Sequence, residues 1–234
     1  MTAKRPHWDL AARRAALRSV PLFGSLSPAE IEQILGQTVL RRADRGTVIL
    51  HRGDPPSGML VILQGSVRVT ATAADGREVT FGVLGAGEFL GEISLLDGAH
   101  RTADVTALEE CVLLVVERAG FLSLIRNNPD LSLKLVSELC RRLRRANLAY
   151  EDLALLDLPG RIGKLLLGLP QQATPAGRRI SFRLSQADLG RLAGGSREKV
   201  NRQLRLWEKQ GVIAREGGHL LILRPETLAS PTTG

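Results

Sequence analysis

The sequence lacks the residues that disulfide scaffolds, metal centres and membrane spans require. Its 234 residues include only two cysteines, Cys111 and Cys140, and four scattered histidines. Two distant cysteines are too few to ligate an iron–sulfur cluster, and we expect both to be reduced. No apolar run approaches the roughly 18 residues that a membrane-spanning helix needs. These absences predict no metal, no catalytic cofactor, no membrane partner and a cytosolic protein.

The sequence also lacks the patterns of a secretory signal and of a catalytic site. The basic residues near the N-terminus, such as Lys4 and Arg13, are not followed by an apolar segment with a small-residue cleavage site. We therefore expect no secretory signal. No nucleophile, base and orienting group come together anywhere in the sequence, so we expect no catalytic residues and no enzyme activity.

Basic residues are concentrated at the C-terminal end of the chain. The formal net charge is +8. Residues 160–234 hold 13 Lys and Arg against 5 Asp and Glu, whereas residues 1–159 hold 19 of each kind. The whole excess belongs to the C-terminal part, which indicates a polyanionic partner there, with nucleic acid ahead of an acidic membrane.

Short β-branched segments separated by glycines occupy the first half of the chain. Two helices are expected before them, one over residues 7–20 and one that starts at Pro28, with Ser27 as its N-cap and Glu30 at the capping-box position. Asp75-Gly76 is typical of a tight hairpin turn. Many short strands with little helix between them predict an antiparallel barrel or jelly roll. The predicted strands are 39–42, 47–50, 59–63, 66–71, 79–84, 101–107 and 111–116.

A constellation suited to a ribose-phosphate lies between two of these strands. Glu92 can accept hydrogen bonds from a sugar hydroxyl, and Arg101 offers a fork of donors to a phosphate. Gly91 lets the backbone approach a ligand closely, and the next residues can open a helical turn with unpaired N–H groups. The alternative is a turn with an exposed ion pair, which stabilises little. The candidate residues are Gly91, Glu92, Ile93, Ser94, Arg101 and Thr102.

One long helix is predicted from Pro129 to Leu156. Asp157-Leu158-Pro159-Gly160 ends it and marks a domain boundary. Apolar residues recur along this helix at spacings of three and four, which forms a stripe on one side of it. A stripe of this kind can cover the helix's own β-roll. One β-roll does not use the whole length of the helix, so we favour a parallel homodimer through the stripe. Asn147, beside this seam, carries the donor and acceptor that a purine edge needs. The predicted dimer seam consists of Leu135, Leu139, Leu143, Ala146, Tyr150 and Leu153.

The C-terminal part predicts a helix, a glycine turn and a second helix over residues 185–204. Ser185 caps the first helix and Ser196 the second, with Gly194-Gly195 between them. The second helix presents charged side chains near its N-terminal end, as a helix-turn-helix does toward the major groove. Residues 171–179 are predicted to be a loop, residues 180–184 a brief strand and residues 211–223 a wing-like hairpin. The candidate DNA-binding residues are Ser196, Arg197, Glu198, Lys199, Asn201 and Arg202.

Taken in this order, the motifs resemble the catabolite activator protein (CRP/FNR) superfamily over nearly the whole chain. Residues 91–103 are similar to its cyclic-nucleotide cassette at Gly91, Glu92, Arg101 and Thr102. Residues 196–202 are similar to its S-R-E-x-V-x-R recognition helix, which implies a TGTGA-N6-TCACA-like palindrome. The resemblance implies an α+β fold: a cyclic-nucleotide-binding β-roll with N-terminal helices over residues 1–128, a dimerisation helix over 129–157 and a winged helix-turn-helix domain over 158–234.

The resemblance also implies the effector and the partners. The adenine-reading Thr-Ser pair of the cAMP receptor falls on Ala146 and Asn147, so this chain lacks one of the two hydroxyls. Thr102 resembles cassettes in which a threonine can also bind guanine. We expect a 3′,5′-cyclic nucleotide, with cAMP, cGMP or both left open. The implied partners are palindromic DNA, a second copy of the chain and RNA polymerase, in the cytoplasm and nucleoid of a bacterium.

Two other interpretations remain at this point. The chain can be a ligand-independent DNA-binding regulator whose β-roll is vestigial or binds a protein. It can also be a regulatory module for an enzyme, although the basic helix-turn-helix region argues against that. DNA affinity that is indifferent to cAMP and cGMP would favour the first of these.

Overall fold

The fold is described from a computed structural model that covers residues 8–73, 78–169 and 171–229. Contacts divide the chain into two compact units, Met1–Val67 with Leu84–Arg142 and Arg68–Val83 with Leu143–Gly234. Within the described ranges no helix is both long enough and apolar enough to cross a membrane.

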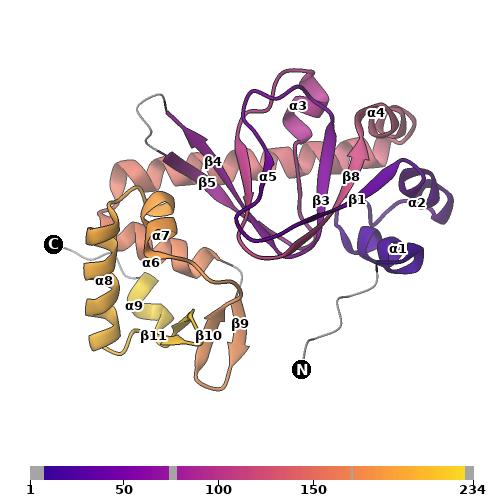
Figure 1. Cartoon of the computed structure of the whole chain (residues 1–234). Helices are drawn as coiled ribbons and strands as arrows, with labels where there is room; N and C mark the ends of the chain where they lie inside the picture. Colours follow the sequence, from indigo (N-terminus) through magenta and orange to yellow (C-terminus); the bar gives the residue numbers. More distant parts are fainter. Residues whose placement is uncertain (1–7, 74–77, 170, 230–234) are drawn as a thin grey trace. The chain divides into compact units, whose positions relative to one another are not determined.

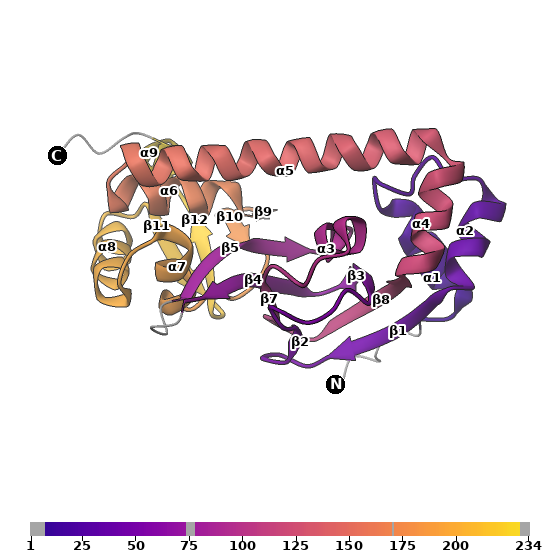
Figure 2. The same ribbon diagram turned by 90° about the horizontal axis from the view of Figure 1, so that it is seen from above.

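The first unit begins with two short helices, α1 (Leu10–Ser19) and α2 (Pro28–Leu35). Ser27 caps α2 and forms the expected capping box with Glu30, so this start signal is confirmed. Figure 2 shows α1, α2 and α4 (Arg118–Asn127) gathered at one end of β1 and β8. Phe23 and Phe121 meet there edge to face, with ring centroids 6.3 Å apart, inside the main hydrophobic core.

Two antiparallel layers make up the β-roll. One sheet has the order β1-β8-β3-β6, formed by Thr38–Ala43, Cys111–Glu117, Gly58–Gln64 and Phe89–Leu90. The other has the order β2-β7-β4-β5, formed by Val48–Leu50, Asp104–Ala107, Ser66–Thr72 and Glu78–Gly85. Almost every residue of β3 and β8 is buried, because both strands lie in the interior of their sheet. The predicted jelly-roll architecture is confirmed; the turn expected at Asp75-Gly76 lies outside the described residues.

The strand expected over residues 101–107 starts three residues late. The backbone of Arg101 is held by the loop before β3, since its N–H donates to the Asp54 carbonyl and its carbonyl accepts from the Gly53 N–H, both at 2.9 Å. Arg101 and Thr102 therefore stand just before β7 rather than in it. The two-residue strand β6 has no sequence prediction, because so short an element carries no periodicity.

The long helix α5 runs from Pro129 to Leu155, as predicted to within one residue. After it, the second unit contains α6 (Leu158–Gly168), capped by Asp157, whose side chain accepts from the Gly160 N–H. Helices α7 (Gln186–Ala193) and α8 (Arg197–Lys209) follow, and they lie side by side in Figure 1. The last helix is α9 (Pro225–Ala229).

A four-stranded sheet of order β11-β12-β10-β9 completes the second unit. The predicted loop at 171–179 is wrong: β9 (Gln171–Thr174) and β10 (Gly177–Ile180) form a hairpin there, and no strand covers 181–184. Polar side chains suit β10 because its backbone pairs with β9 on one side and with β12 (His219–Ile222) on the other. The wing-like hairpin of β11 (Ile213–Glu216) and β12 is confirmed. Its turn residues Gly217 and Gly218 both have positive φ, as a two-residue hairpin turn requires.

Candidate functional site

A sharp turn brings the start of α3 against the Arg101 guanidinium. Strand β6 ends at Leu90, Gly91 adopts a left-handed backbone with φ +83°, and α3 (Glu92–Asp97) follows at once. A Cβ atom on Gly91 would lie 2.6 Å from the Arg101 Nη1 atom. Both the positive φ and this close approach require glycine at position 91, since any side chain there would displace the Arg101 guanidinium.

Four oxygen atoms hold the Arg101 guanidinium. Its Nη1 atom donates to the Gly91 carbonyl at 2.8 Å and to the Ser94 hydroxyl at 2.7 Å. Its Nη2 atom donates to the Gly58 carbonyl at 2.6 Å and to the Ser57 hydroxyl at 3.2 Å. These acceptors lie at or just before the start of β3 and of α3, so Arg101 joins the two segments and its own position is fixed.

The charge of Arg101 is poorly compensated. The residue is 5 % exposed, and it forms no ion pair with any carboxylate in the part of the chain that the structure describes. Burial lowers the pKa of its guanidinium, against smaller opposing effects of the Asp54 and Glu92 carboxylates. The buried Nε–H has no hydrogen-bond acceptor among the described residues. A buried cation with an unused donor is costly, so this arrangement is suited to an anion.

Glu92, the predicted ribose ligand, is 3 % exposed and pairs with a residue that the site prediction omitted. Arg142 of α5 donates from Nη1 to Glu92 Oε1 at 2.9 Å and from Nη2 to the Phe89 carbonyl at 2.6 Å. Its guanidinium also stacks over the Phe89 ring, 4.5 Å from the centroid. Fifty residues separate Arg142 from Glu92, so no local spacing could reveal the contact.

The remaining predicted ligand residues are placed less uniformly. Ser94 is buried beside Arg101, whereas Ile93 and Thr102 are exposed. Ala146 and Asn147 are exposed on the part of α5 that belongs to the second unit. The ribose-phosphate part of the prediction is therefore assembled within one unit, and the base-reading part is not.

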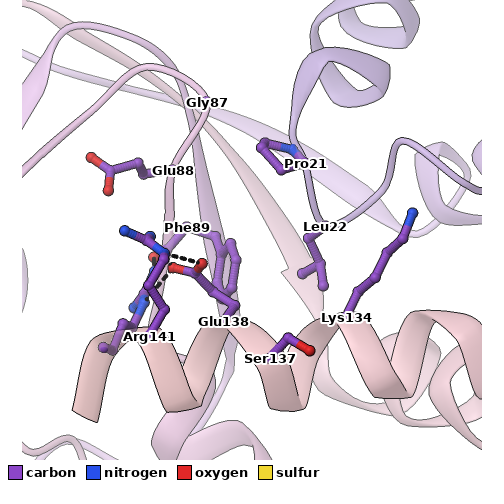
Figure 3. A pocket seen from close by; sticks show the side chains of 10 residues that line it. Pro21, Leu22, Gly87, Glu88, Phe89, Lys134, Ser137, Glu138 and Arg141 are labelled. Carbon is purple, nitrogen blue, oxygen red and sulfur yellow. Dashed lines mark hydrogen bonds and ion pairs between the residues drawn. The ribbon is translucent and has the colours of Figure 1, made fainter. Parts of the chain in front are cut away.

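A separate cavity of about 300 Å³ lies beside Phe89 (Figure 3). Glu138 accepts hydrogen bonds there from Arg141 and Arg142. Burial alone would raise the pKa of Glu138, but these arginines bring it below its ordinary value. Neither Glu92 nor Arg101 lines this cavity. Its walls are Pro21, Leu22, Gly87, Glu88, Phe89, Lys134, Ser137, Glu138, Arg141 and Arg142.

In the second unit, α7 and α8 form the predicted helix-turn-helix. Ser185 and Asp188 make a capping box on α7, and Ser196 caps α8 by accepting from the Lys199 N–H at 3.4 Å. Gly194 has the left-handed φ of +64° that ends α7. A Cβ on Gly190 would lie 2.8 Å from the Gly195 carbonyl, so the turn packs closely on α7.

One face of α8 is buried and the other is charged. Val200, Leu204 and Trp207 are buried, so Trp207 is a core residue. The carboxylate of Glu198 has a pKa below its ordinary value, because its own backbone N–H and the Ser196 hydroxyl hydrogen-bond to it. Asn201 is half-buried and its Oδ1 atom accepts from Gln186 Nε2 at 2.9 Å. The exposed predicted residues are Ser196, Arg197, Glu198, Lys199 and Arg202.

Both halves of the chain match known family models. Residues 40–128 match the cyclic nucleotide-binding domain, and residues 160–230 match the Crp-like helix-turn-helix domain. A CRP-like cAMP-activated global transcriptional regulator of Mycobacterium tuberculosis is 34% identical over 211 residues, which cover 89% of this chain and 94% of that protein. The chain belongs to the CRP/FNR family of transcription regulators. This family consists of transcription regulators rather than enzymes, and the first half of this chain matches the family's cyclic nucleotide-binding domain.

Other CRP/FNR relatives agree with this assignment. The cyclic AMP receptor protein of Thermus thermophilus is 35% identical and covers 84% of this chain and 89% of its own. The crystal structure of the Thermus thermophilus catabolite activator protein is 34% identical, with a TM-score of 0.52 and coverage of 89% and 96%. A c-di-GMP responsive global regulator of Xanthomonas campestris is 27% identical, with a TM-score of 0.72 and coverage of 84% and 99%.

The burial of residues on α5 changes part of the predicted dimer seam. Leu135 is 4 % exposed and belongs to the core of the first unit, and Leu139 packs against that core. Leu135 therefore covers its own β-roll and is not available to a second chain, whereas Leu139 is only partly buried. Leu143, Tyr150 and Leu153 are exposed, at 62 %, 75 % and 56 %, and Ala146 is exposed with them.

Proposed function

We propose that this chain is a homodimeric transcription factor whose affinity for palindromic DNA is set by a 3′,5′-cyclic nucleotide, cAMP and/or cGMP. The nucleotide binds in the β-roll and the palindrome resembles TGTGA-N6-TCACA. The protein acts in the bacterial cytoplasm at the nucleoid, where it contacts RNA polymerase. The family membership supports the general kind of function, and the residues below support the finer parts.

The observation that carries the proposal is the buried Arg101. Its guanidinium is fixed by four oxygens, forms no ion pair within the described ranges and keeps a buried Nε–H without an acceptor. A cyclic phosphate supplies one negative charge and acceptor oxygens, which is the compensation this guanidinium lacks. Thr102, the next residue, is exposed and carries a further hydroxyl donor.

The ribose is assigned to Glu92 and Arg142. The Glu92 carboxylate keeps lone pairs beyond those used by Arg142, and a ribose 2′-hydroxyl donates to such an acceptor. Because Arg142 stands on α5, a ligand at Glu92 would act directly on the long helix. That gives the ligand different contacts in two conformations of the helix, which a population shift requires.

The base is assigned to Thr102, Ala146 and Asn147. Asn147 follows Arg142 by five residues on α5, a rise of about 7.5 Å and a turn of about 140° around the helix, so it would meet the base at the dimer seam rather than on the face that carries Arg142. Its amide offers a donor and an acceptor, so it suits the edge of adenine or of guanine. One of the structural relatives is described as c-di-GMP responsive, so a cyclic dinucleotide belongs in the test beside cAMP and cGMP.

Dimerisation is assigned to an exposed stripe of α5 that alternates every three and four residues. This spacing is the a/d pattern of a two-stranded coiled coil. The stripe shares Leu143 and Tyr150 with the sequence prediction. In place of Leu135, Leu139, Ala146 and Leu153 it uses other solvent-facing residues, Asn147 among them. It consists of Leu133, Val136, Cys140, Leu143, Asn147, Tyr150 and Ala154.

DNA reading is assigned to α8, with Ser196, Lys199 and Arg202 among its exposed residues. Arg197 is assigned to a guanine and Glu198 to a cytosine, the pairing that their hydrogen-bonding groups allow in the major groove. Two copies of α8 about 34 Å apart would reach successive half-sites of the palindrome. The basic excess of residues 160–234 supports this role.

Calorimetry with cAMP, cGMP and c-di-GMP tests the ligand assignment on the wild type and on Arg101→Leu. We expect at least one mononucleotide to bind the wild type, and Arg101→Leu to bind it about 10- to 150-fold more weakly. Arg126→Leu is a matched control, since Arg126 is an exposed arginine of the same unit. Equal affinity of wild type and Arg101→Leu would contradict the assignment, and so would binding of c-di-GMP alone.

A further inference from the structure

Four charged side chains form a closed ring between the strand pair β4–β5 and helix α7. Arg68 of β4 pairs with Asp188 of α7, and its Nη2 atom lies 3.4 Å from Glu78 Oε1 at the start of β5. Arg191 of α7 closes the ring, with Nη2 2.7 Å from Asp188 Oδ1 and Nε 3.2 Å from Glu78 Oε1. Arg68–Val83 and α7 belong to the same compact unit, so these contacts lie within it. Each carboxylate therefore touches both arginines.

The ring combines buried charge with incomplete hydrogen bonding. Asp188 is buried and the other three residues are partly buried. Burial raises the pKa of Asp188, but its hydrogen bonds and the Arg68 charge bring it below its ordinary value, so the carboxylate is ionised at neutral pH. Three buried atoms, Arg68 Nε, Arg191 Nε and Glu78 Oε1, have no well-aligned hydrogen bond among the described residues. Desolvation of four charges then offsets much of their attraction, so the ring can open at little cost.

Both strands of the pair β4–β5 lead directly to the nucleotide site. Strand β3, which begins at the Arg101 acceptor Gly58, continues into β4. Strand β5 is followed by β6, and Glu92 comes directly after the turn that ends β6. In the sheet, β4 lies beside β7, which begins just after Arg101. A ligand held by Glu92 and Arg101 therefore acts on residues that adjoin both strands.

Helix α7 does not need these strands for its own fold. Ser185 and Asp188 form its capping box, and the Arg191–Asp188 pair lies within one turn of the helix. Arg68 and Glu78 add only the link between the strands and the helix. Since α7 packs on α8, whatever holds α7 also holds the DNA-reading helix. None of the four ring residues is among those assigned above to the nucleotide, the dimer or the DNA.

We propose that the ring of Arg68, Glu78, Asp188 and Arg191 is the switch contact through which the nucleotide site acts on the helix-turn-helix. The ring is closed in one state of the strand pair and open in the other, and the nucleotide shifts the balance between them. The proposal rests on the ligand-dependent DNA binding proposed above, and it names the residues that carry the signal.

The test is a DNA-binding titration of full-length variants with and without cAMP or cGMP. Glu78→Gln should reduce the ligand-induced change in DNA Kd from about tenfold to less than about twofold, because glutamine cannot pair with the two arginines. Arg68→Gln should do the same, whereas Arg68→Lys keeps the charge and should retain a larger part of the response. Calorimetry should show that all three variants still bind the nucleotide.

Glu117→Gln is the matched control, because it neutralises an exposed carboxylate at the end of β8, outside the ring. It should keep the full response. A full wild-type response in Glu78→Gln and Arg68→Gln would overturn the proposal. Loss of nucleotide binding in these two variants would also overturn it, since the ring would then support the β-roll instead. A wild type whose DNA affinity ignores both nucleotides overturns the ligand-dependent function itself, which separates the two failures.

Discussion

Replacing Arg101 by leucine should have different effects on two quantities: the stability of the ligand-free protein and its affinity for the ligand. Leucine leaves the Gly58 carbonyl and the Ser94 hydroxyl without the donor that Arg101 supplies, at about 1–3 kcal/mol each, whereas the Gly91 carbonyl still accepts from the Leu95 N–H at 3.3 Å. It also removes a buried cation that no carboxylate pairs, whose desolvation costs several kcal/mol. These opposing effects are similar in size, so the melting temperature of the ligand-free protein should change little compared with the effect on binding.

The ligand-bound protein should behave differently. A hydrogen bond to a charged group contributes about 1.5–3 kcal/mol, so loss of the phosphate contact should weaken binding by about 10- to 150-fold. A ligand at 100 times its Kd stabilises the wild type by about 2.7 kcal/mol, or roughly 5–11 °C for a chain of this size. With a 100-fold weaker Kd, the same ligand concentration should raise the melting temperature of Arg101→Leu by only about 1–2 °C.

Thermal unfolding with and without cAMP or cGMP measures both quantities on one sample. The exposed Arg126→Leu should keep the full ligand-induced shift. A ligand-induced shift that survives in Arg101→Leu would show that the buried guanidinium does not bind the phosphate. A ligand-free Arg101→Leu that fails to fold would show that the four oxygen contacts outweigh the desolvation of the cation.

Three further predictions concern the turn, the acid response and the dimer. Gly91→Ala should lower the free energy of unfolding in urea by about 1–3 kcal/mol, since alanine must adopt φ +83° and its Cβ approaches Arg101; wild-type stability would remove the close-approach argument. Burial alone would raise the pKa of Asp188, but Ser185, Arg191 and a neighbouring arginine lower it below its ordinary value. The ionised carboxylate therefore contributes to the free energy of unfolding above about pH 4, and this contribution is lost as the pH falls through the lowered pKa. Asp188→Asn should flatten that acid limb in pH-dependent melting curves, and an identical limb would refute the assignment. Leu143→Glu should convert the dimer to monomer in sedimentation, whereas a variant with glutamate in place of the adjacent Arg144 should not; a monomeric wild type would contradict the seam.

Local signals predicted much of the helical structure. Ser27, Ser185 and Ser196 cap helices where the sequence indicated, because a cap and its partner lie within three residues of each other. The glycine turn at Gly194 was also predictable, because its signal is local in the sequence. The loop prediction for residues 171–179 was wrong because β9 is held by backbone pairing with β10. The polar side chains of β9 give no periodic pattern that would indicate such pairing.

The nucleotide site was only partly predictable. Glu92 and Arg101 lie nine residues apart and form a recognisable motif, but the partner of Glu92, Arg142, becomes visible only when α5 packs on the roll. The dimer seam stays a prediction, and burial changes it at one residue for a related reason. Apolar residues follow two stripes of α5, and periodicity alone does not show that Leu135 belongs to the core while Leu143 faces solvent.

The central claim is that a cyclic mononucleotide sets the affinity of this protein for its DNA site. The direct measurement is a DNA-binding titration of the wild type and Arg101→Leu on a TGTGA-N6-TCACA duplex, without ligand, with cAMP and with cGMP. The account predicts that one mononucleotide or both change the Kd of the wild type by about tenfold or more, with a much smaller change for Arg101→Leu at the same ligand concentration. One and the same wild-type Kd in all three conditions would contradict it and would favour a ligand-independent regulator.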